Sequence, residues 1–486
     1  MSVKWDRRSV AEQRRLQNEK LHRYLTEVIA PFSPYYRKMF RDHQIDPRHI
    51  KTVVDLRHLP FTGKADLLPT SEQPERFREF IITPDVSVLK HRPRVVAEAL
   101  FRGRRAVERR FELEYRPIFL TATTGRSSLP VAFAYTDYDM RNLRTAGARL
   151  IQTFGATTKM RGVNMFPYAP HLAFWQVVFA GLEFGMLLVS SGGGKVMGTD
   201  GNINLIEKIK PEAIIGIPTF VYHVIRQAHE QGRKWPHVTK IVLGGEKGPH
   251  GMRCKMVSLL QEMGAGDVRV CGTYGFTEAR LAWGECPTPP DQSSGYHLFP
   301  DLGIFEVIDP ETGAVKGEGE PGELVYTPLD ARGTVVLRYR TGDYVAGGLT
   351  WEPCPHCGRT VPRVVGSIGR DSSTKELNIS KVKGTLVNFD TLQQILDDTV
   401  EVGEWQLEIR KAHDDPHDVD ELILHLAPVN GANIERLKEK IRTRFQTDVE
   451  ITPNRIEVHS LDDMLRRIKL ETSLKDVRVL DARPKE

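Results

Sequence analysis

Short apolar runs alternate with amphipathic stretches between residues 115 and 345. The apolar runs close on Gly, Pro, Ser or Thr, which is typical of strands that end in a loop. They lie at residues 116–123, 161–168, 185–191, 213–218, 240–246 and 268–275. Helix-like segments separate several of them, at residues 204–210, 220–231 and 254–264. The alternation predicts an α/β fold with buried, partly parallel sheets, whose strand-end loops are the usual place for a ligand.

The two ends of the chain lack the regular alternation of strand-like and helix-like segments seen between residues 115 and 345. Residues 1–60 read as helical with a break at 30–36, and "LPFTGKADL" (59–67) reads as a turn that leads into a helix. The polar stretch 369–376 is a candidate linker. Beyond it, strand-like and helix-like patterns mix, with strands expected at 404–412, 421–428 and 454–460 and a helix at 433–445. We therefore expect a large domain of packed mixed or parallel sheets and helices (1–369) and a small mobile α+β lid domain (370–486).

Composition narrows the class of partner. The 486 residues are 40% hydrophobic and 27% charged, and 68 basic against 63 acidic residues leave a net charge of +5. This balance argues against nucleic acid as the main partner. The Arg-rich stretches 5–15 and 102–110 also carry acidic residues at helical spacing, so we interpret them as solvated helix faces. No apolar segment is long enough to span a membrane, no secretory signal opens the chain, and five cysteines favour a reducing cytoplasm.

Three strand-end loops carry side chains suited to a nucleotide. "LTATTGRSSLP" (120–130) offers hydroxyls and backbone N–H groups for phosphate oxygens, but it lacks the lysine of a Walker loop. "GGE" (244–246) and "YGFTE" (274–278) each end a strand with glycine and a carboxylate. Tyr274 could stack on an adenine, and Glu278 could hold Mg²⁺. Each loop alone is equally an ordinary turn, with carboxylates that cap nearby helices.

The segment "RYRTGDYV" (338–345) can likewise be read either as an ordinary turn or as part of a nucleotide site. We read residues 333–339 as a strand and the Thr-Gly pair after it as a turn that presents Asp343. Taken alone, this is most simply a surface turn, where Asp and Gly are common for backbone reasons. A carboxylate in this position could also accept both hydroxyls of a ribose.

A constellation of three cysteines and one histidine stands apart from these loops. "CPHC" holds Cys354 and Cys357, Cys286 lies in "GECPTPP", and His297 follows in "GYHLF". Three thiolates and an imidazole are typical of a structural zinc site. A redox CxxC is the alternative, although this one lacks the helix start that lowers a thiol pKa. The remaining two cysteines, at 254 and 271, are expected to be buried packing residues.

Eight motifs in this order resemble the adenylate-forming enzymes of the acyl-CoA ligase superfamily, and most closely the phenylacetate–CoA ligase branch. They are "LPFTGKADL", the "TTG" loop, "GGE", "YGFTEA", "GELVYTPL", "YRTGDYV", "GR" at 369–370 and "KDVRVLDAR" at 475–483. The resemblance covers the chain from about residue 55 to its end. It implies ATP-dependent activation of a small carboxylic acid as an acyl-adenylate, followed by transfer to coenzyme A.

The resemblance also implies residue roles. Lys475, Glu278 and Thr124 would be catalytic, with Glu278 positioning Mg²⁺ and Lys475 acting as the mobile lysine, for which Lys469 is the competing candidate. The nucleotide set would be Thr123, Gly125, Gly245, Glu246, Tyr274, Gly275, Thr277, Asp343 and Arg370, with Asp343 on the ribose and Arg370 helping from the hinge. Some members of this branch also carry a cysteine-rich metal site, which agrees with zinc at Cys286, His297, Cys354 and Cys357.

The chain departs from the family pattern at a few positions. Ala122 stands where the phosphate loop usually has Gly, and Ser372 and Ser373 replace two acidic hinge residues. Because the hinge serves the second half-reaction, the acceptor could be a carrier protein, an amine or another nucleophile instead of coenzyme A. A non-catalytic nucleotide sensor is a third hypothesis, which retention of the charged motif residues disfavours. A homodimer also remains open.

The acid itself should bind near residues 164–175 and 216–223. Tyr168, His171, Phe174 and Phe220 would suit an aromatic or arylacetic acid. Aromatic residues at this density are equally typical of an ordinary hydrophobic core, so the sequence leaves the identity of the acid open.

Overall fold

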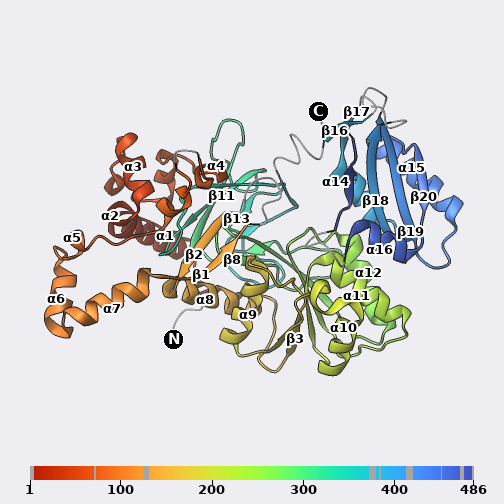
Figure 1. The fold of residues 1–486 in the computed structure, drawn as a ribbon, viewed down its shortest axis with the longest axis horizontal. Coiled ribbons are helices and arrows are strands. Elements are labelled where there is room, and N and C mark those ends of the chain that lie inside the picture. The colour runs from red at the N-terminus through yellow and green to blue at the C-terminus, as the bar shows by residue number, and fades with distance from the viewer. Residues whose placement is uncertain are drawn as a thin grey trace.

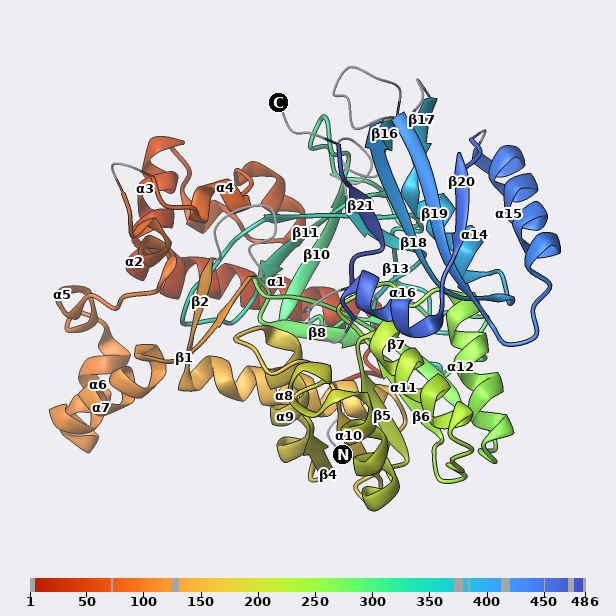
Figure 2. The ribbon, with the colours of Figure 1, turned by 45° about the vertical axis from the view of Figure 1, so that its right-hand side comes forward.

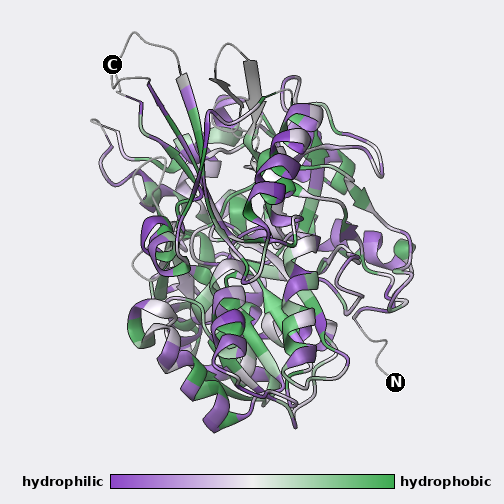
Figure 3. Cartoon of the chain, turned by 90° about the vertical axis from the view of Figure 1, so that its right-hand side faces the viewer, coloured by the Kyte–Doolittle hydropathy of each residue, from purple (hydrophilic) through white to green (hydrophobic). Residues whose placement is uncertain are grey.

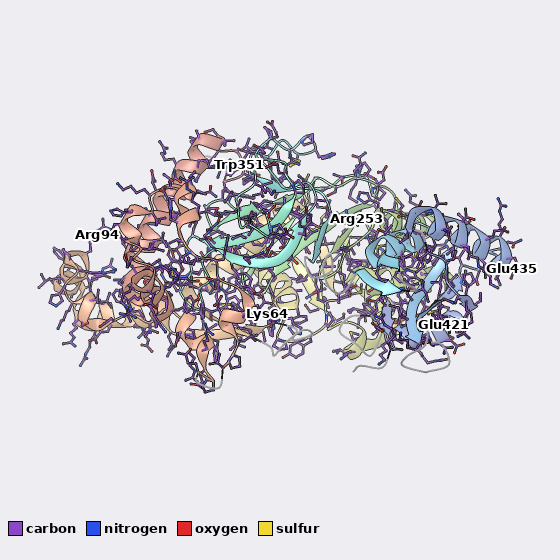
Figure 4. All side chains as sticks on the ribbon, turned by 90° about the horizontal axis from the view of Figure 1, so that it is seen from above. Lys64, Arg94, Arg253, Trp351, Glu421 and Glu435 are labelled. Atoms are coloured by element: carbon purple, nitrogen blue, oxygen red, sulfur yellow. The ribbon has the colours of Figure 1, made fainter. Side chains whose placement is uncertain are left out.

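A large sheet-based body and a smaller C-terminal unit lie side by side along the long axis of the molecule (Figure 1). In the view from above, Arg94 of the body and Glu435 of the C-terminal unit stand near opposite ends of that axis (Figure 4). The structure is a computed structural model. It describes residues 5–70, 73–123, 131–370, 379–382, 385–411, 420–449, 451–470 and 476–483.

A nine-stranded mixed sheet forms the centre of the body, in the order β13-β14-β9-β8-β7-β6-β5-β3-β4. The strands from β7 to β4 run parallel, and β8, β9, β13 and β14 extend the sheet in antiparallel pairs. Their bounds are β3 Arg161–Asn164, β4 Leu187–Ser190, β5 Ala213–Gly216, β6 Lys240–Leu243, β7 Arg269–Phe276, β8 Leu281–Gly284, β9 Tyr296–His297, β13 Leu349–Thr350 and β14 Arg363–Val364. The predicted parallel α/β core is thereby confirmed.

Helices cover both faces of this sheet. Because side chains alternate along a strand, Ile215 of β5 faces one layer, with Leu150 and Phe174, whereas Ile214 faces the other, with Ile206 and Val224. The first layer is α8 (Asp137–Thr153) and α9 (Leu172–Phe184), and the second is α10 (Gly194–Ile209), α11 (Pro218–Glu230) and α12 (His250–Glu262). In Figure 3 the strands of this region are mainly green, and the helices around them alternate between purple and green.

A second, antiparallel sheet packs with the N-terminal helices around another core. Its order is β10-β11-β12-β15, with bounds Gly303–Ile308, Gly322–Pro328, Tyr339–Val345 and Ile368–Arg370. The helices are α1 (Val10–Tyr24), which runs into a π-helical turn (Leu25–Ile29), then α2 (Ala30–Phe32), α3 (Pro34–Asp42), α4 (Lys64–Leu67), α5 (Val86–Leu89), α6 (Pro93–Arg102) and α7 (Arg104–Tyr115). Single 3₁₀ turns lie at Pro47–His49, Val53–His58 and Arg76–Phe80, and β1 (Pro117–Ala122) pairs with β2 (Ala132–Thr136). The predicted helical N-terminus and its break near Ser33 are confirmed.

The C-terminal unit, which we call the lid, has its own sheet and its own core. The sheet order is β20-β19-β18-β21, with bounds Arg455–Val458, Asp420–Pro428, Val402–Lys411 and Val479–Asp481. Helices α14 (Phe389–Asp397) and α15 (Ile434–Val449) cover one face, and a hairpin of β16 (Ile379–Val382) and β17 (Thr385–Asn388) precedes them. This α+β arrangement matches the prediction. The domain boundary after residue 369 stays a prediction, because Arg370 ends β15 in the body sheet.

The lid docks on helices α11 and α12 of the body (Figure 2). Its helix α16 (Leu461–Ile468) contributes Met464 and Ile468 to the same core cluster as Met256 of α12. Buried charges join the two parts as well. Arg226 Nη2 of α11 lies 3.5 Å from Glu404 Oε1, and Lys255 Nζ donates to the carbonyl of Thr399 at 2.9 Å.

Gly251 of α12 lies directly against the lid residues Asp397 and Asp398. A Cβ at this position would stand 2.5 Å from Asp398 Oδ1 and 2.9 Å from the carbonyl oxygen of Asp397. We expect Gly251→Ala to disfavour docking by about 1–3 kcal/mol, the usual cost of overpacking, although alanine favours the helix itself. Small-angle scattering should report a larger radius of gyration. The matched control is Gly266→Ala, where a Cβ meets nothing within 4 Å; equal scattering from both variants would contradict the prediction.

Several local expectations need correction. The strand predicted at 333–339 is wrong: strand β12 begins at Tyr339 and includes the whole Thr-Gly-Asp segment. Strand β7, by contrast, runs from Arg269 to Phe276, within one residue of the predicted run 268–275. Cys254 is exposed on α12, whereas Cys271 is buried as expected. Among the described residues, no helix has the length and apolarity to cross a membrane.

Candidate active site

The carboxyl ends of β3, β5 and β6 bring three loops together at one edge of the parallel sheet. After β6, Gly244 and Gly245 pass close to the ring of Phe166, which follows β3. A Cβ on Gly244 would lie 2.0 Å from Thr273 Oγ1, whose hydroxyl donates to the carbonyl of Leu243 at 3.0 Å. Position 244 must therefore be glycine, because Thr273 fills the space that any side chain would need.

Glu246, in the loop after β6, is held in place at this edge of the sheet. The hydroxyl of Thr219, at the start of α11, donates to Glu246 Oε2 at 3.0 Å. Behind the loop, the buried guanidinium of Arg253 donates to the carbonyl of Gly248 and pairs with Glu285 at 2.8 Å. Glu285 also accepts from the amide of Gly272 at 2.5 Å. This buried pair fixes the "GGE" loop against β7, and Figure 4 marks Arg253 between the body and the lid.

Asp343 sits in a β-bulge of strand β12. Opposite β11, residues 340 and 344 pair with Val325 and Glu323, so three residues of β12 face the single Leu324. Gly342 makes this possible with φ +69°. Bulges commonly re-aim a side chain, and here Asp343 turns toward β7, where the hydroxyl of Tyr274 donates to Asp343 Oδ2 at 2.8 Å. Asp343 is 7% exposed.

The N-terminal "PFTGK" motif holds the start of strand β12. The amide of Thr62 donates to the carbonyl of Arg338 at 3.1 Å, and the amide of Arg340 donates to the carbonyl of Thr62 at 2.9 Å. The guanidinium of Arg338 pairs with buried Glu306 at 3.0 Å and lies over the ring of Phe61. Burial raises the pKa of Glu306, against the opposing effect of Arg338. These contacts fix the register that places Asp343.

Glu278 lies in the tight turn between β7 and β8. The hydroxyl of Tyr339, at the start of β12, donates to Glu278 Oε1 at 2.8 Å. Tyr274 and Tyr339 thus each orient one acidic side chain from a neighbouring sheet. Carboxylates oriented in this way could hold a sugar hydroxyl pair and a hydrated divalent cation.

The base of the predicted phosphate loop is closed by Thr123. Its amide donates to the carbonyl of Val131 at 3.0 Å, and its hydroxyl accepts from the amide of Val131 at 3.0 Å. The Nδ1–H group of His171 donates to the carbonyl of Ala122 at 2.8 Å. His171 therefore supports the phosphate loop from below, a contact that the sequence prediction of an acid-binding residue did not include.

The four predicted metal ligands come together at the antiparallel end of the large sheet. The ligand atoms of Cys286, His297, Cys354 and Cys357 all lie within 4.8 Å of one another. Cys286 Sγ stands 3.8 Å from Cys354 Sγ, the separation of about 3.8 Å that a tetrahedral zinc ion with bonds of about 2.3 Å requires. Cys357 Sγ lies 3.3 Å from His297 Nε2, and His297 Nδ1–H donates to the carbonyl of Gly284 at 3.2 Å.

Comparison with known proteins agrees with this geometry. Residues 138–328 match the model of the AMP-binding enzyme family. The phenylacetate–coenzyme A ligase of Aromatoleum evansii is 26% identical over 500 residues, which cover 99% of this chain and 97% of that protein. The enzyme of the same name from Thermus thermophilus is 27% identical over 359 residues, 74% of this chain and 70% of that protein. By these matches the chain is similar to adenylate-forming enzymes, and in particular to phenylacetate–CoA ligases.

Solved structures of adenylate-forming enzymes share the fold. The crystal structure of 2-hydroxyisobutyryl-CoA ligase in the postadenylation state, in complex with R3-HIB-AMP, has a TM-score of 0.76 at 19% identity and covers 98% of this chain and 91% of its own. The same ligase in the thioesterification state has a TM-score of 0.63 at 19% identity, over 99% of this chain and 91% of its own. The two-part architecture is therefore shared with this ligase.

Some residues expected from the adenylate-forming family fall outside the described parts of the chain. These are Thr124 and Gly125 of the phosphate loop, Ser372 and Ser373 of the hinge, and Lys475. For Arg370 the backbone is described, and it pairs with Asp343 across β12 and β15. Its role at the ribose stays a prediction, as does the choice between Lys475 and Lys469, which is exposed at the end of α16.

The four residues predicted to contact the acid do not form one lining. Phe174 is buried in the core cluster between α8, α9 and the sheet, whereas Phe220 is buried on the opposite face against Gly194. Tyr168 is 64% exposed and makes edge contacts with the rings of Phe174 and Trp175. The core interpretation therefore fits Phe174 and Phe220 well, and the acid-binding role of all four remains untested.

Sequence reasoning missed the residues that hold the motif side chains in place. Phe166, Thr219 and Tyr339 contact "GGE" or "YGFTE" from elements far away in sequence, and the Arg253–Glu285 pair holds Gly248 and Gly272 beside these motifs. Tyr339 alone had a usable signal, because it stands within "RYRTGDYV" and opens the strand that bears Asp343. The others look like ordinary core or helix residues until the chain is folded.

Proposed function

We propose that this protein activates a carboxylic acid with ATP and transfers the acyl group to the thiol of coenzyme A, releasing pyrophosphate and AMP. The observation that carries the proposal is the Tyr274–Asp343 hydrogen bond of 2.8 Å beside the glycine loop after β6. It fixes a carboxylate near the carboxyl end of the parallel sheet, where Asp343 could accept the two hydroxyls of a ribose. The names of the relatives, phenylacetate–coenzyme A ligases, support the same activity.

In the first half-reaction, a carboxylate oxygen of the acid attacks the α-phosphorus of ATP and pyrophosphate leaves. Asp343 would accept the ribose hydroxyls, and Tyr274, Gly245 and Glu246 would border the adenine. Glu278, oriented by Tyr339, would hold a Mg²⁺ ion that neutralises phosphate charge. In this proposal Lys475 adds a positive charge where the transition state gains negative charge.

In the second half-reaction, the thiolate of coenzyme A attacks the acyl carbonyl and AMP leaves. A single site can serve both steps if the lid changes its position between them. The higher likeness to the postadenylation state than to the thioesterification state supports a lid placed for the first step. The buried contacts of Arg226 and Lys255 with the lid would have to separate before the second.

The acid is proposed to be aromatic. Phe166 lies against the "GGE" loop, and Tyr168 and Trp175 extend a set of aromatic rings from the same strand end. Rings of this kind bind a flat acyl group by edge and face contacts.

We also propose that Cys286, His297, Cys354 and Cys357 hold a structural zinc ion. The thiol separation fits tetrahedral zinc, and the Gly284 carbonyl fixes the histidine tautomer that leaves Nε2 as the ligand. With four protein ligands the ion would have no open position, so its contribution would be to join β8, β9 and the loop between β13 and β14.

Pyrophosphate release tests the proposed activity directly. ATP, Mg²⁺ and a panel of aryl, arylacetic, fatty and amino acids are supplied, each with and without coenzyme A. We expect release with an aromatic acid and faster AMP formation when coenzyme A is present. Release that is indifferent to coenzyme A would instead favour a carrier protein or an amine as acceptor. No release with any acid would overturn the proposal.

Glu278→Gln is expected to lower the rate of adenylate formation by about 10²–10³-fold. The amide keeps the side-chain shape and the contact with Tyr339 but loses the negative charge that binds Mg²⁺. Raising the Mg²⁺ concentration should recover part of the rate. The matched control is Glu19→Gln, whose side chain is 68% exposed on α1; an unchanged rate in Glu278→Gln would refute the assignment.

A further inference from the structure

A cluster of potential metal ligands lies in the lid, on elements that the proposed reaction does not use. It consists of His425 on β19, Glu457 on β20 and His459 directly after β20, and we call it the lid cluster. His425 and Glu457 are direct neighbours in the parallel pairing of the two strands. The amide of His459 donates to the carbonyl of Leu426 at 2.8 Å, which holds the second imidazole beside the first.

The three ligand atoms form a triangle of metal-site size. His425 Nδ1 lies 2.9 Å from His459 Nε2 and 3.3 Å from Glu457 Oε2, and His459 Nε2 lies 3.8 Å from Glu457 Oε2. Ligands at about 2.0–2.2 Å from a tetrahedral ion stand about 3.3–3.6 Å apart. The observed distances bracket this range, so one ion could contact all three atoms after small side-chain rotations.

A carboxylate stands behind the buried histidine. Glu408 Oε2, on β18, lies 3.1 Å from His425 Nε2. Metal-binding histidines usually donate their second N–H group to such a carboxylate, which leaves the other nitrogen free to bind the ion. Arg467 of α16 pairs with the same Glu408 oxygen and lies 2.8 Å from His425 Nε2. The competing arrangement is thus a hydrogen-bonded histidine pair in which His425 Nε2 accepts from Arg467.

The open side of the lid cluster faces solvent. The His425 side chain is 3% exposed, whereas those of His459 and Glu457 are 25% and 41% exposed. An ion can therefore enter from the surface and keep water as a fourth ligand, as ions held by two histidines and a glutamate do.

We propose that His425, Glu457 and His459 bind one divalent transition-metal ion, of the class of zinc, cobalt or nickel. Imidazole and carboxylate donors suit these metals better than calcium or magnesium. The site joins β19 and β20 at the residue before Ser460, which caps α16. Because Met464 and Ile468 of α16 pack against the body, the bound ion would brace the lid at its docking helix.

Cobalt titration of the full-length protein tests the lid cluster. The protein, with the cysteine site left loaded with zinc, is freed of weakly bound metal by gel filtration and titrated with Co²⁺, whose visible d–d bands report binding. Nitrogen and oxygen ligands give these bands without the near-ultraviolet charge-transfer band that thiolates produce. This difference separates the lid cluster from the cysteine site. In the wild type we expect one equivalent of cobalt that gives d–d bands without the thiolate charge-transfer band.

His459→Ala and Glu457→Gln should each weaken this binding by about 100-fold, the upper range for disturbing a metal site. Matched controls are His49→Ala and Glu435→Gln, both exposed and remote from the lid cluster. The controls should bind as the wild type does. A wild type without thiolate-free bands, or variants that bind cobalt as tightly as the wild type, would overturn the proposal and leave a hydrogen-bonded histidine pair.

Discussion

Replacing Asp343 with alanine is expected to lower kcat/KM for ATP in the pyrophosphate-release assay by about 10²-fold or more. A carboxylate that accepts two ribose hydroxyls makes two charge-assisted hydrogen bonds, each of about 1.5–3 kcal/mol, and each 1.4 kcal/mol corresponds to about tenfold. The loss should appear mainly in KM for ATP if the ribose is bound equally in the ground and transition states. The fold should be retained, because Asp343 lies in a bulge whose glycine and neighbouring pairs are unchanged.

Two milder variants give the graded control. Asp343→Asn keeps the shape and one acceptor oxygen, so we expect a smaller loss than in the alanine variant. Tyr274→Phe removes the hydroxyl that orients Asp343 and should cost about 1 kcal/mol, or roughly fivefold. If Asp343→Ala retained the wild-type KM for ATP, the carboxylate would not bind the ribose, whatever the effect of the tyrosine variant.

Removing the metal from the cysteine–histidine site is expected to destabilise the body strongly. Cys354→Ser, or prolonged treatment with a strong zinc chelator, should lower the melting temperature by on the order of 10 °C, because loss of a metal site is among the largest single effects on stability. Elemental analysis should at the same time show one zinc ion fewer per chain. Adding zinc back should restore the chelated wild type but not the serine variant.

The free cysteines supply the control for this experiment. Cys254→Ser changes a thiol exposed on α12 and should leave both the metal content and the melting temperature unchanged. Burial raises the pKa of Cys271 to about 12, so that thiol stays protonated and does not compete as a ligand. A Cys354→Ser protein that keeps its zinc and its melting temperature would rule out the structural role.

The parts of the fold that local pattern decides could be predicted. Strands β3 to β7 and helices α10 to α12 follow from short apolar runs and amphipathic spacing, and the four lid elements follow in the same way. Strand β12 could not be predicted, because its bulge depends on pairing with β11 and on the docking of Thr62 from another region. The apolar run before Tyr339 (333–338) has the local pattern of a strand, but in the fold it is a connecting segment.

In the candidate site, too, some residues could be predicted from local sequence and others could not. The chemical groups, such as Asp343, Glu278 and the cysteines, stand in short motifs and could be selected from sequence. Their supports, such as Thr219 on Glu246 and Phe166 beside Gly245, come from elements far away, so no local pattern signals them. His171, which the sequence predicts to bind the acid, also contacts the phosphate loop at the carbonyl of Ala122, and its role at the acid stays a prediction.

The brace between the "PFTGK" motif and strand β12 has a consequence for synthesis of the chain. Thr62 cannot make its two backbone hydrogen bonds until Arg338 and Arg340 have left the ribosome. The same holds near the start, where the guanidinium of Arg7 donates to the carbonyl of Cys357 at 3.0 Å. The N-terminal helices must therefore wait with part of their apolar surface uncovered for roughly 300 residues, about 15–60 s at typical elongation rates. Chaperones that bind nascent chains would have their longest opportunity on these helices.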